Sequence, residues 1–413
     1  MSASQFDVAV IGAGPSGAVA SALLNKRGFK VCVLEKQHFP RFVIGESLLP
    51  HCMEMLEEAG FADAVRAEPS FQFKNGAAFS WGSRYTEFDF TDKFSDGPGT
   101  VYQVRRGIFD KILIDEAAKQ GVEVRFGHGV TAFDNSGDLA RLSVEADTGE
   151  SYELTAKFVL DASGYGRVLP RLLNLETPSH LPPRQAHFTH IDDNITNPKF
   201  DRSKILITTH PQHRDVWIWL IPFGDNRCSI GVVGTPDVLA GESETVLKKF
   251  VYECPMLKEI LDKAVWENDF PFRSIQGYSA NVKSLHGKHF ALLGNAAEFL
   301  DPVFSSGVTI ALHSAKLAAD LLAKQLEGGA ADWDAEFAKP LMIGVNAFRT
   351  YVNGWYDFRF QNAIYAPNRS PEISRMISSI LAGYAWDTEN PFVAKSEQRL
   401  SALAALVGEV KVE

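Results

Sequence analysis

Three glycines and one glutamate near the N-terminus have the types and spacing that bind a dinucleotide. The loop with Gly12, Gly14 and Gly17 joins a short apolar, β-prone run to a helical segment. Glycines at this spacing permit a tight turn and close approach of the backbone to a pyrophosphate, while Glu35, which ends the next apolar strand, can accept hydrogen bonds from a ribose. The pattern predicts a strand, loop and helix that hold a dinucleotide.

A second set of residues could bind an anion. Ser306 and Gly307 precede an alanine-rich segment at 308–325, which predicts a long helix. The first N–H groups of a helix lack partners within the helix, and the helix dipole is positive at this end. The sequence therefore predicts an anion site at Ser306 and Gly307.

Lys74 and a pair of tryptophans are further candidates for functional residues, although each also has an ordinary structural explanation. The segment 71–81 alternates apolar and polar residues, which predicts one half-buried strand with Lys74 on its polar side. From this strand alone, Lys74 is interpreted as an ordinary solvated cation. In the segment 216–222, alternation places Trp217 and Trp219 on one face, either in a core or at a functional surface.

The elements that must position these residues fall into two patterns. Strands alternate with helices before residue 180 and after residue 279, which predicts a parallel sheet, whereas strands dominate between them. The expected organisation is a discontinuous nucleotide-binding domain (1–70, 100–180 and 279–330), a β-sheet substrate domain (71–99 and 181–278) and a helical C-terminal region (331–413).

Composition excludes several classes of function. The chain has 413 residues, with 41 basic and 51 acidic side chains and a formal charge of -10, so nucleic acid is not an expected partner. We find no apolar run long enough to span a bilayer and no export signal, and we expect a cytoplasmic protein. The four cysteines form no CxxC pair, so neither a disulfide framework nor a metal site is expected.

These motifs together resemble those of a known family. The glycine loop, the segments 106–110 and 161–164, and the strand end at 294–295 resemble FAD-dependent oxidoreductases of the p-hydroxybenzoate hydroxylase type. More narrowly, WIWLIP at 217–222 resembles the WxWxIP motif of flavin-dependent halogenases, and FLDPVFSSG at 299–307 resembles their FxxPxxSxG motif. Gly45-Glu46-Ser47 and Lys74 stand where those enzymes carry the flavin strap and the catalytic lysine.

The resemblance implies a fold and a set of site residues. The fold is α/β, α+β overall: a Rossmann-like FAD-binding domain with an inserted β-sheet substrate domain and a helical C-terminal region. Lys74 is the implied catalytic residue, Ser306 and Gly307 bind halide, and Trp217, Trp219, Phe299 and Phe304 line the tunnel between flavin and substrate. The implied FAD contacts are Gly12, Gly14, Pro15, Ser16, Gly17, Glu35, Lys36, Glu46, Ser47, Arg106, Asp161, Gly164, Asn295, Asp301, Pro302 and Gly307.

The resemblance also implies a mechanism. Reduced FAD (FADH₂) reacts with dioxygen to a C4a-hydroperoxide, and chloride or bromide attacks its distal oxygen to give hypohalous acid. Lys74 captures or hydrogen-bonds that acid and presents electrophilic halogen to an electron-rich aromatic ring. The expected substrate is a phenol, resorcinol or pyrrole, free or tethered to an acyl or peptidyl carrier protein. Because one dinucleotide fingerprint is present, a separate flavin reductase is expected to supply FADH₂.

The sequence departs from the family pattern in three places, one of which is a C-terminal part shorter than that of tryptophan halogenases, so their indole pocket is expected to be absent. Phe304 occupies a place where tryptophan halogenases carry glutamate, as in the phenol and pyrrole halogenases, and Asn295 replaces the usual aspartate of the strand end. The alternatives are a dehydrogenase or reductase of the geranylgeranyl-reductase type, an aromatic hydroxylase and a non-catalytic flavin-binding protein. The substrate, the preference between chloride and bromide, the regiochemistry and the oligomeric state are left open.

Overall fold

One sheet of the protein is built around the N-terminal strand. The computed structural model describes residues 4–179 and 181–411, so residues 1–3, 180 and 412–413, at the ends of predicted domain segments, lie outside the described residues. Five strands of this sheet run parallel in the order β19-β10-β1-β2-β7. They are β19 (Phe290–Leu292), β10 (Ser151–Asp161), β1 (Ser4–Ile11), β2 (Val31–Glu35) and β7 (Glu123–Phe126). The two-residue β18 (His286–Gly287) and the antiparallel β8 (His128–Asp134) and β9 (Ala140–Ala146) complete the sheet.

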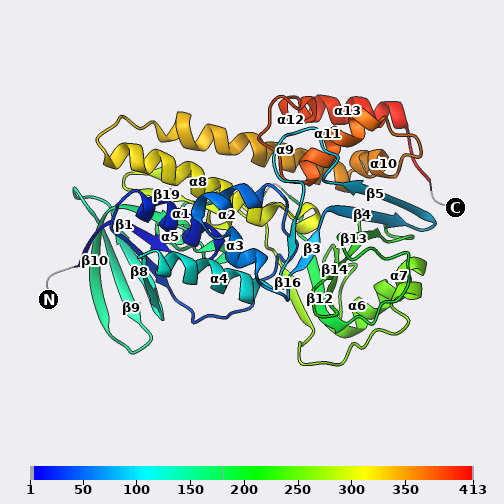
Figure 1. The fold of residues 1–413 in the computed structure, drawn as a ribbon, viewed down its shortest axis with the longest axis horizontal. Coiled ribbons are helices and arrows are strands. Elements are labelled where there is room, and N and C mark those ends of the chain that lie inside the picture. The colour runs from blue at the N-terminus through cyan, green and yellow to red at the C-terminus, as the bar shows by residue number, and fades with distance from the viewer. Residues whose placement is uncertain (1–3, 180, 412–413) are drawn as a thin grey trace.

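Helices cover this sheet and place their first turns at its carboxyl edge. Gly14 precedes α1 (Pro15–Lys26), and Ser305 precedes α8 (Ser306–Leu326), which packs on α1 (Figure 1). Ligands of open α/β sheets bind outside the carboxyl ends of the strands. The remaining helices of this part are α2 (Cys52–Ala59), α3 (Ala62–Arg66), α4 (Arg106–Lys119) and α5 (Val168–Leu172).

A second sheet of seven strands has the order β16-β12-β15-β14-β13-β4-β5. These strands are β16 (Arg273–Gln276), β12 (Gln185–Asp192), β15 (Arg227–Gly234), β14 (Trp217–Pro222), β13 (Lys204–Thr209), β4 (Gly76–Trp81) and β5 (Arg84–Asp89). Along β14, Trp217, Trp219 and Ile221 belong to the main core, whereas Ile218 and Leu220 pack with α6 (Ser243–Tyr252) and α7 (Pro255–Ile260). The predicted alternation of this segment is confirmed.

The prediction of one strand over 71–81 is wrong, and so is its prediction of a solvated Lys74. The chain breaks at Asn75, so β3 (Gln72–Lys74) pairs with β6 (Val101–Gln103) in a separate two-stranded sheet, while β4 joins the large sheet. The break changes which faces are covered: Phe73 is 46% exposed, whereas Lys74 is 0% exposed. A further two-stranded sheet pairs β11 (Glu176–Thr177) with β17 (Asn281–Val282).

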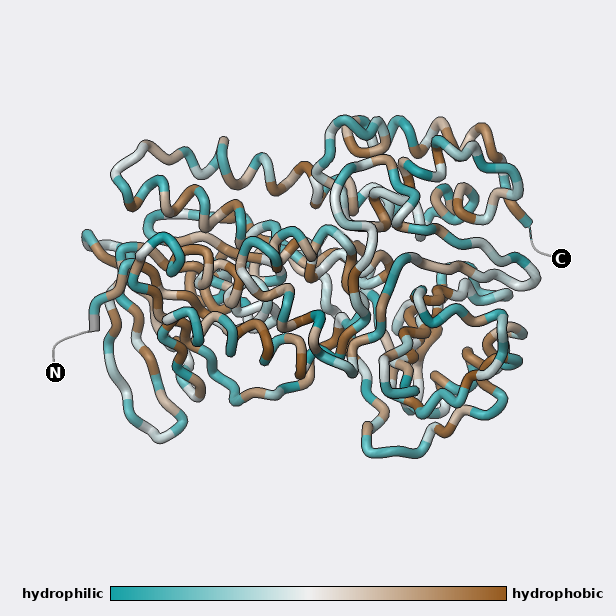
Figure 2. The backbone as a smooth tube through the Cα atoms, viewed as in Figure 1, coloured by the Kyte–Doolittle hydropathy of each residue, from teal (hydrophilic) through white to brown (hydrophobic). Residues whose placement is uncertain are grey.

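The C-terminal region is helical, as predicted. Its helices are α9 (Lys339–Tyr356), α10 (Arg359–Tyr365), α11 (Pro371–Leu381), α12 (Pro391–Ala394) and α13 (Ser396–Val407). Figure 1 shows α9 beside α8 and the last helices over β4 and β5. Hydrophobic residues concentrate in the strands and in the helix faces that meet them (Figure 2). Within residues 4–179 and 181–411, no helix combines the length and apolar character needed to cross a membrane. The domain boundaries stay a prediction.

Candidate functional site

A cavity of about 1130 Å³ lies between the two sheets and is bordered by both. It extends from the glycine loop to the tryptophans of β14 and the start of α8. Most residues predicted to bind FAD or to line the tunnel belong to its wall. They are Gly12, Gly14, Pro15, Ser16, Glu35, Lys36, Glu46, Ser47, Arg106, Gly164, Asn295, Pro302 and Gly307, with Trp217, Trp219 and Phe299.

The three glycines of the first loop do different work. A Cβ on Gly17 would lie 2.0 Å from the carbonyl oxygen of Gly12, and a Cβ on Gly12, where φ is +99°, would lie 2.6 Å from the carbonyl oxygen of Ala162. Close backbone packing therefore requires glycine at these two positions. A Cβ on Gly14 would meet only the Arg41 guanidinium, at 3.5 Å. Gly14 therefore leaves open the part of the wall that a pyrophosphate would approach.

Glu35 holds the loops at this end of the cavity. Its carboxylate accepts hydrogen bonds from the backbone N–H of Ala13 at 2.9 Å and of Gln37 at 2.8 Å. A carboxylate has more acceptor sites than these two bonds use, so it can also accept from a ribose hydroxyl. The residues present fit the adenosine half of FAD.

Arg106 fixes the long loop that crosses the cavity. Its guanidinium forms an ion pair with Asp110 and donates to the carbonyl oxygens of Ile44 at 3.0 Å and Gly45 at 3.3 Å. Burial lowers the pKa of Arg106, but the Asp110 carboxylate more than offsets this, so that the pKa lies above its ordinary value. Arg106 thus holds the segment 41–47, which we call the strap, along the cavity, and the predicted contact of Gly45-Glu46-Ser47 with flavin stays a prediction.

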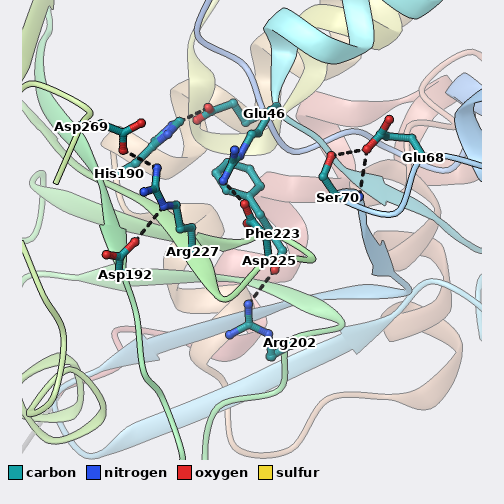
Figure 3. A network of polar contacts seen from close by, with 11 residues as sticks. Glu46, Glu68, Ser70, His190, Asp192, Arg202, Phe223, Asp225, Arg227 and Asp269 are labelled. Carbon is teal, nitrogen blue, oxygen red and sulfur yellow. Dashed lines mark hydrogen bonds and ion pairs between the residues drawn. The ribbon is translucent and has the colours of Figure 1, made fainter.

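Glu46 of the strap forms a buried pair with His190 of β12. The Oε1 atom of Glu46 lies 2.7 Å from Nε2 of His190, and the His190 ring stacks on Phe270 with centroids 3.8 Å apart. Figure 3 shows this contact with Arg227 of the neighbouring strand below it. The second oxygen of Glu46, Oε2, is buried and has no hydrogen-bond partner among the described residues. A donor on a bound cofactor would satisfy it.

Lys74 is buried beside the strap and outside the cavity wall. Its Nζ donates to Oγ of Ser47 at 2.8 Å and to the carbonyl oxygen of Leu48 at 2.7 Å, and it lies 5.5 Å from the centroid of the Phe90 ring. Burial lowers the pKa of Lys74 from 10.5 to about 7, and no carboxylate among the described residues offsets this effect. Lys74 thus reaches the cavity through the Ser47 hydroxyl.

The two tryptophans close the cavity on the side of the second sheet. Nε1 of Trp219 donates to Oγ of Ser229 at 3.0 Å, and Nε1 of Trp217 donates to the hydroxyl of Tyr356 at 3.1 Å. Tyr356 in turn donates to Oδ2 of Asp301 at 2.9 Å. Burial raises the pKa of Asp301 to about 6. A helix of the C-terminal region therefore joins the WIWLIP segment to the FLDPVFSSG segment.

The start of α8 faces the same cavity. Ser305 adopts a left-handed conformation, with φ of 56°, and no side chain caps the helix at this residue. Ser305 and Gly307 belong to the wall, whereas Ser306 is buried outside it. The free N–H groups and the positive end of the dipole suit an anion.

Other predicted residues lie outside the cavity wall and form hydrogen bonds or packing contacts in the surrounding structure. The carboxylate of Asp161 accepts from the backbone N–H of Ser163 and Leu169, and that of Asp301 accepts from the N–H of Val303. Phe304 packs against Trp355 and Phe360. The predicted residues outside the wall are Gly17, Lys74, Asp161, Asp301, Phe304 and Ser306.

Sequence reasoning missed several residues of the site. Arg41 and Tyr165 line the cavity, His190 pairs with Glu46, and Tyr356 bonds Trp217. The unusual length of the loop around Arg41 was a usable signal, but no local pattern singles out His190 or Tyr356. Among residues 4–179 and 181–411, no group of histidine, cysteine, aspartate and glutamate side chains is arranged to hold a metal ion.

Comparison with known proteins agrees with this geometry. Residues 5–336 match the family described as FAD binding domain. The 1H-pyrrole-2-carbonyl-(peptidyl-carrier protein) chlorinase of Pseudomonas fluorescens is 29% identical, over 87% of this chain and 83% of its own length. The solved structure of a flavoprotein/dehydrogenase from Cytophaga hutchinsonii is 44% identical, with a TM-score of 0.93 and 98% of each chain covered. That of the myxobacterial chondrochloren halogenase CndH is 28% identical, with a TM-score of 0.74, covering 98% of this chain and 97% of that one.

Proposed function

The chain belongs to the FAD binding domain family and, within it, to the flavin-dependent halogenases, and from this premise we propose that it halogenates an electron-rich aromatic ring with Lys74 as the catalytic residue. One observation carries the proposal. Lys74 is fully buried, has no carboxylate partner among the described residues, and donates a hydrogen bond to Ser47, a residue of the cavity wall. An amine kept in this state costs stability, because burial disfavours its charged form. A catalytic role explains why such a residue is present.

Lys74 is suited to polarising hypohalous acid. When bound, reduced FAD supplies the electrons with which dioxygen and halide give this acid. Because the pKa of Lys74 is about 7, its amine is present both as ammonium and as free amine near neutral pH. The ammonium donates hydrogen bonds that polarise an O–X bond, where X is the halogen, and the site excludes water around it. The aromatic substrate then receives electrophilic halogen.

Chloride or bromide binds at the start of α8 in this proposal. The backbone N–H groups of Ser306 and Gly307 are its donors, so Ser306→Ala leaves the halide site largely intact. A Cβ on Gly307 would lie 3.2 Å from the Phe299 ring, and the larger Gly307→Val side chain crowds both anion and flavin. A bromide-soaked crystal is expected to give an anomalous peak at this helix start, and its absence from crystals with reduced FAD would contradict the site.

The expected substrate is a phenol, resorcinol or pyrrole. The relative named as a chlorinase of a carrier-bound pyrrole supports a substrate tethered to a carrier protein. A separate flavin reductase supplies FADH₂, since the sequence has one dinucleotide fingerprint. The four cysteines are free and buried, as is usual in a reducing compartment, and this supports a cytoplasmic location.

A flavin-dependent dehydrogenase is the second candidate function. It is favoured by the 44% identity with the flavoprotein/dehydrogenase from Cytophaga hutchinsonii. A dehydrogenase has no use for a buried lysine held by a hydroxyl and a carbonyl instead of a carboxylate, which is the reason that we place it second.

The two candidates differ in their dependence on halide. Protein supplied with FADH₂, dioxygen and bromide is incubated with phenols, pyrroles and a pyrrole-loaded carrier protein, and the products are read by mass spectrometry. The halogenase proposal predicts product with the isotope pattern of bromine and none without halide. Equal conversion without halide contradicts it, and rapid reduction of bound flavin by NADPH without halogenated product favours the dehydrogenase.

A further inference from the structure

Among the described residues, the hydrogen bond between Ser47 and Lys74 is the only polar contact that joins Lys74 to the cavity wall. The Lys74 side chain is 0% exposed and outside the cavity wall, whereas Ser47 belongs to the wall. The two hydrogen bonds of Nζ go to Oγ of Ser47 and to the carbonyl oxygen of Leu48, a buried residue outside the cavity wall. Ser47 therefore lies between the amine of Lys74 and the cavity.

The position of this hydroxyl is set by backbone pairing on both sides. Ser47 forms an isolated β-bridge with Gln103. The N–H of Val104 donates to the carbonyl oxygen of Glu46 at 2.7 Å, and the N–H of Leu48 donates to that of Tyr102 at 3.3 Å. Because β3 pairs with the same strand β6, the Ser47 hydroxyl and the Lys74 amine are held by one short piece of sheet.

We propose that the hydroxyl of Ser47 contacts hypohalous acid in the cavity and transmits to it the effect of Lys74; this inference rests on the proposed function. A hydroxyl both donates and accepts hydrogen bonds. When Lys74 is an ammonium, Oγ of Ser47 accepts from it and the Ser47 O–H donates to the acid. When Lys74 is a free amine, the Ser47 O–H donates to its lone pair and Oγ accepts the O–H of the acid. In the ammonium state this chain draws electron density from the acid oxygen and makes the halogen more electrophilic, and in both states the amine acts without entering the cavity.

The variants Ser47→Ala and Ser47→Thr separate this role from packing. Ser47→Ala removes the hydroxyl, and Ser47→Thr keeps it. A matched control is Ser80→Ala on β4, because Ser80 is buried and its hydroxyl bonds Oγ1 of Thr208 at 2.8 Å, away from Lys74. FAD affinity and thermal unfolding of each variant are measured first, so that a misfolded variant is recognised.

We expect Ser47→Ala to lower halogenated product per FADH₂ oxidised by about tenfold or more, the size expected for losing a hydrogen bond to a charged group. Ser47→Thr restores most of the yield, and Ser80→Ala keeps it. A second measurement needs no flavin. The pKa of Lys74 is measured by NMR of labelled lysine in the apoprotein, and the Lys74 signal is assigned by its loss in Lys74→Met. Ser47→Ala lowers the Lys74 pKa there, because the ammonium loses an acceptor.

The outcomes distinguish this inference from the proposed function. Wild-type protein that gives no halide-dependent product overturns both. Wild-type product together with unchanged yield and unchanged Lys74 titration in Ser47→Ala overturns the role of Ser47 alone. A yield lost equally in Ser47→Ala and Ser80→Ala, with no change in the Lys74 titration, assigns Ser47 a structural role and also overturns the inference.

Discussion

The two ends of the FAD cavity are formed by different kinds of group, backbone at one end and side chains at the other. The end at α1 consists mainly of backbone, where the glycines pack against main-chain atoms of Gly12 and Ala162 and the Glu35 carboxylate accepts from the N–H of Ala13. The end at Lys74 consists of side chains from β3, the strap, β12 and α9, which are far apart in the sequence. A short motif can specify a backbone site by itself, whereas a side-chain site forms only when the whole fold is in place.

The two ends also differ in how charge is satisfied. Glu35 is a buried carboxylate that accepts two backbone N–H bonds. Lys74 is a buried cation that bonds a hydroxyl and a carbonyl. The first arrangement is stabilising, whereas burial of the second group without a carboxylate partner lowers the pKa of the amine to about 7. Mutations at the first end should therefore affect folding and FAD affinity, and those at the second end should affect reactivity.

The largest effect is expected at the backbone end, where two glycines can be contrasted. Gly17→Ala places a Cβ against the carbonyl of Gly12, a backbone atom that cannot move freely, and should cost about 3 kcal/mol or more of stability. Gly14→Ala should leave the apoprotein as stable as the parent, because its Cβ has room, but should weaken FAD binding. Chemical unfolding of apoprotein and FAD titration measure the two effects. Equal unfolding of both variants would contradict the division of roles.

The next effect concerns the pH dependence of stability at the side-chain end. The folded-state pKa of Lys74, about 7, lies below its ordinary value of 10.5, so the unfolded chain binds more protons between these values. Lys74 is therefore most destabilising below pH 7, and stability rises with pH through this window by up to about 1.4 kcal/mol per pH unit. Lys74→Met removes this rise. An equal dependence of stability on pH in the parent and Lys74→Met from pH 7 to pH 10 would contradict the lowered pKa of Lys74.

A smaller effect is expected for Glu35. Glu35→Ala removes the acceptor offered to the ribose and two loop contacts, and should weaken FAD binding by about 1–3 kcal/mol. Calorimetric titration of apoprotein with FAD measures the change. Unchanged affinity would argue against the assignment of Glu35 to the adenosine ribose.

The smallest effect concerns Tyr356, which joins the C-terminal helices to the cavity. Tyr356→Phe removes the hydroxyl between Trp217 and Asp301 and should cost about 1 kcal/mol. The Asp301 carboxylate loses a donor, so its pKa should rise further above about 6, and the loss of stability should be greatest above that pH. Thermal unfolding at pH 5 and pH 8 tests this; an equal loss at both pH values would mean that the hydroxyl does not bond the carboxylate.

The sequence predicted the backbone end well and the side-chain end only in part. The glycine loop, the first turn of α8 and the alternation of Trp217 and Trp219 depend on local periodicity, and the structure contains all of them. Lys74 was identified by resemblance, but its burial was missed because the strand breaks at Asn75 and its two halves join different sheets. The contacts of His190 and Tyr356 depend on pairing between distant segments, for which a single sequence carries no signal.

The most direct test of this account compares the parent with Lys74→Met in one reaction mixture containing FADH₂, dioxygen, bromide and an aromatic substrate. Consumption of FADH₂ is followed by absorbance, and halogenated product is followed by mass spectrometry. Methionine keeps the length of the side chain but has no N–H. We predict that Lys74→Met binds FAD and oxidises FADH₂ about as fast as the parent, while halogenated product falls to background. Halogenation by Lys74→Met equal to that of the parent would contradict the catalytic role of Lys74.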